Sequence, residues 1–114
     1  MWKVGERPEN APDDFPQIVP EGFPDWEKKM DTWGNKLLEA TRAIASMAAI
    51  GMGVHQNTFT DRMDGGAHLL GPTGSDLHKN DVGTILAGFH YDISFMTIHG
   101  RSRYPGLSLW TRDW

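Results

Sequence analysis

The chain of 114 residues contains no cysteine. This absence excludes a disulfide framework and metal sites built from thiolates. Any metal site must therefore use nitrogen and oxygen donors, which the five histidines and fifteen acidic residues can supply. Because disulfides belong mainly to secreted proteins, we expect this protein to be cytoplasmic.

Long apolar runs and an excess of positive charge are also missing. No run approaches the roughly 20 apolar residues that span a bilayer, and the N-terminus lacks the layout of a signal peptide, so we expect no membrane partner. The formal net charge is -4, whereas nucleic-acid binders are usually basic, so we expect no nucleic-acid partner. A chain of this length is enough for one small domain.

Residues 1–24 are rich in proline, which forbids helix because it lacks the backbone N–H. We expect an extended arm that lies on the body of the protein through its large apolar side chains. A ligand for a proline-recognition domain is the alternative reading, although the arm is acidic and has no clean Pro-x-x-Pro core. The prolines recur at every fourth position, and the apolar contacts are expected from Trp2, Phe15, Ile18, Val19 and Phe23.

Residues 25–50 have the periodicity of a long helix. Asp25 follows a proline and suits the N-cap, while Gly51 and Gly53 suit the C-terminal end. Apolar residues at steps of three and four predict a single buried stripe, which we assign to core packing rather than to a ligand surface. The expected stripe consists of Trp26, Met30, Trp33, Leu37, Thr41, Ile44 and Ala48.

The second half of the chain predicts shorter elements. We expect a short helix over 58–63, a strand over 67–70 and another strand over 84–90, with turns between them. The glycine-rich turn that starts at Gly71 lacks the Lys-Ser or Lys-Thr of a phosphate loop, which argues against nucleotide binding.

His90 and Asp92 are the candidate metal ligands. They are one residue apart at the end of the apolar run 84–89, and side chains two positions apart point to the same face of a strand. An imidazole and a carboxylate are two of the three ligands in the facial arrangement that holds non-haem Fe(II) and leaves positions open. The pair therefore predicts an iron site.

The segment 88–99, closed by 104–110, resembles the core of the isopenicillin N synthase-like Fe(II)/2-oxoglutarate-dependent dioxygenases. In that family a His-x-Asp is followed by a short apolar strand with a threonine and then by a Gly-Leu-x-x strand. The resemblance extends upstream through 47–51 and 68–73 and covers about the last two thirds of the chain. It implies an α+β fold, an incomplete double-stranded β-helix (jelly roll) over 25–114 that the long helix over 25–50 braces.

The resemblance also implies an activity. A member of this family is an oxidoreductase that binds Fe(II) and uses 2-oxoglutarate as cosubstrate, and dioxygen and a small organic molecule are its reaction partners. Here His90 and Asp92 would be the metal ligands. The family's distal histidine and its Arg-x-Ser lie some fifty residues further on, so we expect an N-terminal portion or truncated product of a longer oxygenase that lacks the third ligand.

Two features near the end of the chain could be mistaken for the missing groups. Arg101-Ser102-Arg103 lies too early for the family motif, and we interpret it as a solvated turn. His99 is the nearest substitute ligand, but strand alternation places it on the face opposite His90 unless the strand breaks near Ser94.

Two other functions remain open at this point. The chain could be a non-catalytic fragment or partner-binding scaffold derived from the same fold, as the missing distal half suggests. A zinc hydrolase built from the five histidines ranks last, because no His-x-x-x-His or comparable spacing is present.

Overall fold

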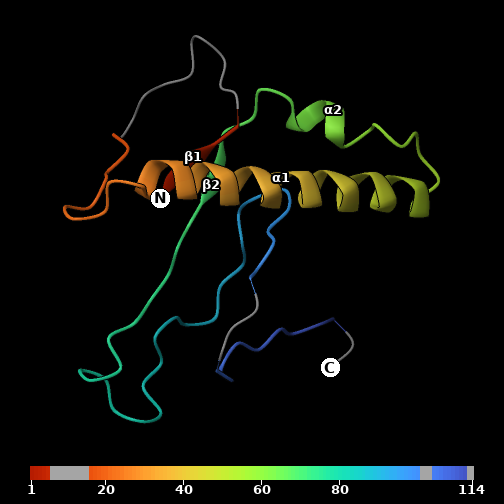
Figure 1. Ribbon diagram of the computed structural model, residues 1–114. Helices are drawn as coiled ribbons and strands as arrows, with labels where there is room; N and C mark the ends of the chain where they lie inside the picture. The colour runs from red at the N-terminus through yellow and green to blue at the C-terminus, as the bar shows by residue number, and fades with distance from the viewer. Residues whose placement is uncertain (6–15, 101–103, 113–114) are drawn as a thin grey trace.

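A computed structural model describes residues 1–5, 16–100 and 104–112. One long helix dominates the architecture, and two short strands and a short helix pack along it (Figure 1). The elements in chain order are β1 (Trp2–Val4), α1 (Trp26–Gly51), α2 (Thr60–Met63) and β2 (His68–Leu70). After β2 the described chain leaves this assembly in irregular conformation and later returns to it (Figure 1), since the Phe95 ring lies 5.3 Å from the Phe59 ring just before α2.

Helix α1 corresponds to the helix predicted over 25–50. Asp25 occupies the N-cap position but makes no cap hydrogen bond through its side chain. At the other end, the Met52 N–H donates to the Ala48 carbonyl at 2.9 Å, and the Gly53 N–H donates to the Ile50 carbonyl at 3.0 Å. Gly53 adopts a φ of 73°, the left-handed conformation that ends a helix without steric cost at glycine.

The buried face of α1 agrees with the predicted stripe only at Met30 and Thr41. The buried residues are Met30, Gly34, Thr41, Ala45 and Ala49. Trp33 and Ile44, which were expected in the core, are 54% and 47% exposed. The physical reason is that the packed elements approach the helix closely, so its small residues, rather than its largest ones, line the contact.

Strands β1 and β2 form a two-stranded antiparallel sheet in which Trp2 pairs with Leu70 and Val4 with His68. The sheet packs on the first half of α1, where Trp2, Val4 and Met30 form the buried cluster, and Trp26, Leu38 and Leu70 pack around it. The Trp2 Nε1 donates a hydrogen bond to the Asp31 Oδ1 at 2.7 Å. This sheet and helix therefore share one small core.

The predicted arm over 1–24 is only partly described. Its first residues belong to β1, and Trp2 is in the core, as a contact with the body requires. Ile18, Val19 and Phe23 are largely exposed. The Phe23 ring nevertheless lies 6.2 Å from that of Trp26 in edge-to-face geometry, and Ile18 lines a cavity beside Trp2. Phe15 and the prolines at positions 8 and 12 lie outside the described residues.

The predicted α+β jelly roll with a bracing helix is wrong. The described residues contain two strands of three residues each, in one sheet, where a jelly roll uses about eight strands in two sheets. The strand expected over 84–90 is irregular, and Val82, Ile85 and Ile93 are highly exposed. A strand needs neighbours for its backbone N–H and C=O groups, and this segment has none among the described residues.

The remaining predicted elements are found at slightly different bounds. The helix expected over 58–63 is α2 (Thr60–Met63), and the strand expected over 67–70 is β2 (His68–Leu70). No helix in the described ranges is both long and apolar enough to cross a membrane.

The contact between Gly34 and Val4 generates a first prediction. A Cβ added at Gly34 would lie 2.6 Å from the Val4 Cγ2, closer than any real contact. We expect Gly34→Ala to lower the free energy of unfolding by about 1–3 kcal/mol through overpacking, in spite of the higher helix propensity of alanine. Urea unfolding followed by circular dichroism measures the change.

Gly51 is the matched control in the same helix. A Cβ there meets nothing within 4 Å. Gly51→Ala should leave stability unchanged or raise it by up to about 1 kcal/mol. If both substitutions changed stability equally, the close approach of β1 to α1 would be wrong.

The hydrogen bond between Trp2 and Asp31 generates a second prediction. Asp31→Ala leaves a buried indole N–H without its charged acceptor, so we expect a loss of about 1.5–3 kcal/mol in the free energy of unfolding. Asp25→Ala is the control, because this exposed carboxylate lies 3.9 Å from the equally exposed Lys29 Nζ, and it should cost less than about 1 kcal/mol. Equal losses in the two variants would contradict the assignment.

Candidate functional site

The predicted metal ligands His90 and Asp92 lie side by side in the irregular segment that follows β2. The His90 Nε2 is 3.6 Å from the Asp92 Oδ1, and both side chains are partly exposed. They reach the same side of the chain although no strand is formed there. Local backbone alternation is therefore enough to bring this pair together.

His99 joins the pair from the opposite side of the carboxylate. Its Nε2 is 3.5 Å from the Asp92 Oδ2. The chain bends at Ser94 and Phe95, which cancels the alternation that would have placed His99 on the far face. Two imidazoles and one carboxylate thus meet within ten residues of sequence, and Asp92 lies between the two rings.

The ring orientation of His90 is fixed by a second contact. Its Nδ1 lies 2.7 Å from the Gly88 carbonyl oxygen. A carbonyl oxygen only accepts hydrogen bonds, so Nδ1 carries the proton in this contact. In the neutral ring, Nε2 then has a free lone pair that faces Asp92. A lone pair and a carboxylate repel each other unless a cation lies between them, either a proton on Nε2 or a metal ion.

The donor set fits Fe(II) in kind, but the spacing is wider than in a metal centre. Two donors that bind an ion at about 2.1 Å and at right angles lie about 3 Å apart. Within residues 1–5, 16–100 and 104–112, no three such side chains are arranged to hold an ion as they stand. The arrangement shown is a carboxylate between two imidazoles at the protein surface.

The other predicted residues do not join this cluster in any contact of the described chain. The His55 Nδ1 accepts a hydrogen bond from the Asn57 N–H at 3.3 Å, and the His68 Nε2 lies 2.9 Å from the Met63 carbonyl oxygen. His78 is exposed in the turn after Asp76. The Arg-Ser-Arg sequence at 101–103 lies outside the described residues.

Aromatic rings flank the cluster. The centroid of the Phe89 ring is 5.4 Å from that of Tyr91 and 5.4 Å from that of Trp110, both in edge-to-face geometry. All three rings are largely exposed. Such pairs contribute about 0.5–1.5 kcal/mol beyond burial, so the contact helps to hold the His90 segment against the end of the chain.

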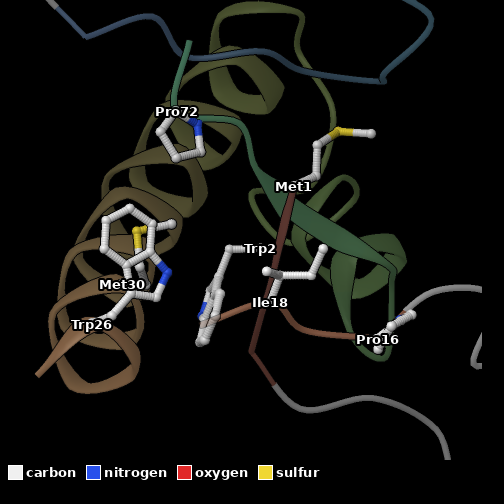
Figure 2. Close-up of a pocket in the computed structure, with 7 residues that line it drawn as sticks. All are labelled: Met1, Trp2, Pro16, Ile18, Trp26, Met30 and Pro72. Carbon is white, nitrogen blue, oxygen red and sulfur yellow. The ribbon is translucent and has the colours of Figure 1, made fainter. Parts of the chain in front are cut away.

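A separate cavity of about 370 Å³ lies where β1 meets the start of α1 (Figure 2). The Nε1 of Trp26 is buried there and has no hydrogen-bond partner in the described part of the chain. Neither His90, Asp92 nor His99 lines this cavity, so it is distinct from the metal candidate. Its lining is apolar and carries no charged side chain: Met1, Trp2, Pro16, Ile18, Trp26, Met30 and Pro72.

Sequence reasoning missed the cavity, because it assigned Trp26 and Met30 to a filled core. A signal was available in the first residues, where Trp2 and Val4 alternate with polar or charged neighbours as a half-buried strand does. Recognising that strand would have placed the Trp2 ring beside Trp26 on the helix, where the cavity lies.

In comparisons with known proteins, the chain matches no family model, no curated protein and no solved structure. The dioxygenase resemblance of residues 88–110 is therefore neither supported nor refuted by them. We therefore infer function from the contacts of the site, in which two imidazole rings face one carboxylate.

Proposed function

We propose that His90 and Asp92 bind Fe(II) and that the chain contributes this metal site to an oxidation reaction of the 2-oxoglutarate-dependent type. The observation that carries the proposal is the position of Asp92 between two imidazoles, with nitrogen-to-oxygen distances of 3.6 Å to His90 and 3.5 Å to His99. Two histidines and one carboxylate are the facial ligand set of non-haem iron oxygenases.

The residues of this chain have separate tasks in such a site. His90 would donate through Nε2, because the Gly88 carbonyl keeps its proton on Nδ1. Asp92 would offset half of the charge of the ion, and His99 would complete the donor set that the sequence resemblance left without a third ligand. The three side chains are partly exposed, so the described chain leaves them room to move to metal-binding distances.

A bound Fe(II) would supply the electrons that activate dioxygen, with 2-oxoglutarate as the cosubstrate that is oxidised to succinate and carbon dioxide. The protein's part is to present lone pairs on one side of the ion and to leave the other side open. Phe89 and Tyr91, beside the two ligands in sequence, would form an apolar wall next to a bound organic substrate.

A second candidate function is supported by a different observation. Large apolar side chains are exposed along the irregular segment after β2, and Val82 and Ile93 are fully exposed. Exposed apolar clusters commonly mark surfaces that bind a partner protein. A non-catalytic, partner-binding role would use the same segment without a metal.

The third prediction tests the metal site. Mn(II), a redox-inert substitute for Fe(II), should broaden the NMR signals of residues around Asp92 in the wild-type protein. We expect His90→Ala, Asp92→Ala and His99→Ala each to weaken Mn(II) binding at least tenfold, because each removes one donor of three. His78→Ala is the control, since His78 has no contact with Asp92 in the described chain, and it should bind as the wild type does.

Turnover separates the two functions. If the chain is an oxygenase, Fe(II) and 2-oxoglutarate should give succinate, and Asp92→Ala should abolish it. Unchanged Mn(II) binding in Asp92→Ala would overturn the metal site. Metal binding without any succinate would leave the metal site in place and overturn the oxygenase function. Neither metal binding nor succinate would favour the partner-binding function.

A further inference from the structure

Helix α1 has a second apolar face that the described elements leave uncovered. We name it the outer face and define it by residues spaced four and three apart: Trp33, Leu37, Ala40, Ile44, Met47 and Gly51. Trp33 is 54% exposed, Ile44 47% and Met47 71%. Elements β1, β2 and α2 contact α1, and the residues it buries under them are Met30, Gly34, Thr41, Ala45 and Ala49.

The spacing of the outer face is that of a coiled coil. Alternating steps of four and three give a repeat of 3.5 residues, the period that keeps a seam facing a second helix. The residues that α1 buries under β1, β2 and α2 mostly follow steps of four, which does not give the 3.5-residue repeat of a coiled coil. The flanks of the outer face are also mostly uncharged. One flank consists of Lys36, Ala43 and Ile50, and the other of Gly34, Thr41 and Ala48, where Gly34 and Thr41 are already buried by the elements that pack on α1.

We infer that the outer face binds the same face of a second copy of this chain, with the two helices antiparallel. The order of large and small side chains along the outer face favours this partner and this direction. In an antiparallel pair with its two-fold axis at Arg42, each layer joins residues whose numbers are symmetric about that position. The layers are Trp33 with Gly51, Leu37 with Met47, and Ala40 with Ile44.

These layers combine sizes that fill a seam evenly. The largest residue faces the smallest, and a branched residue faces an alanine, which is the interdigitation that close packing needs. A parallel pair would place Trp33 against Trp33 and Gly51 against Gly51, so one layer would be overfilled and another would be empty. The antiparallel arrangement is therefore the one that this face fits.

Charges agree with the same arrangement. Arg42, at the two-fold axis, points away from the outer face, and its Nη2 donates to the Asp64 Oδ1 at 2.6 Å. Lys36 is the single formal charge on the flanks defined above, and in the antiparallel pair it lies opposite Ala48. Its alkyl stem can cover that alanine while the ammonium stays in water. No like charges meet across the seam.

The fourth prediction is that the chain self-associates through this face. Analytical ultracentrifugation of the wild-type chain should show a dimer that dissociates on dilution. Ile44→Glu places a carboxylate in a central layer and should raise the dissociation constant at least tenfold. Asn35→Glu is the matched control, since it adds the same charge to an exposed position of α1 off the outer face, and it should dimerise as the wild type does.

Circular dichroism of Ile44→Glu should show an intact helix, because this half-exposed residue lies outside the buried cluster. A sequence with no cysteine allows a test of direction that does not depend on that variant. In the antiparallel pair, Cys at position 37 of one copy faces position 47 of the other, whereas the two copies of position 37 are separated by about 15 Å along the axis.

Oxidation of a mixture of Leu37→Cys and Met47→Cys chains should therefore give the mixed disulfide, and Leu37→Cys alone should give little crosslinked product. A wild-type chain that stays monomeric up to millimolar concentration would overturn the inference, as would efficient crosslinking of Leu37→Cys with itself. The Asp92→Ala chain should dimerise normally, so failure of the metal site and failure of this interface are distinguishable.

Discussion

The structure depends on the close contact between Val4 and Gly34. The absence of a side chain at Gly34 lets β1 approach the backbone of α1, where any larger residue would collide with the valine methyl groups. That approach buries Trp2 and Val4 against Met30 and brings the Trp2 indole to Asp31. With β1 in place, β2 has a strand to pair with, and the chain from α2 to β2 is drawn along the same side of the helix.

Much of the helical part could be predicted from the sequence, but its orientation could not. The 3.6-residue periodicity marked the helix, and the glycine pair near position 52 marked its end. Two apolar stripes lie next to each other on this helix, one with large residues and one with small residues. Periodicity favours the large residues. The observed contact buries Met30 and Thr41 of that stripe together with the small residues Gly34, Ala45 and Ala49 beside it, because the small residues allow β1 to come so close.

The candidate site could also be predicted only in part. The proximity of His90 and Asp92 follows from positions two apart in extended backbone, which is a local property that sequence can give. The position of His99 depends on a bend at Ser94 and Phe95. Serine is common in turns, so the sequence could name a break near Ser94 as the condition, but a single serine does not decide that the chain bends there. The jelly roll was an inference from resemblance alone, and the strands it required have no partners in the described chain.

The pairing of β1 with β2 has a consequence for synthesis of the chain. Residues 2–4 leave the ribosome long before their partners, residues 68–70, so the core cannot close until the whole of α1 and the chain up to β2 have been made. During that interval Trp2 and Val4 are open to chaperones and to other nascent chains, whereas α1 needs only local hydrogen bonds to begin forming. The order of events during translation is thus helix first and sheet last.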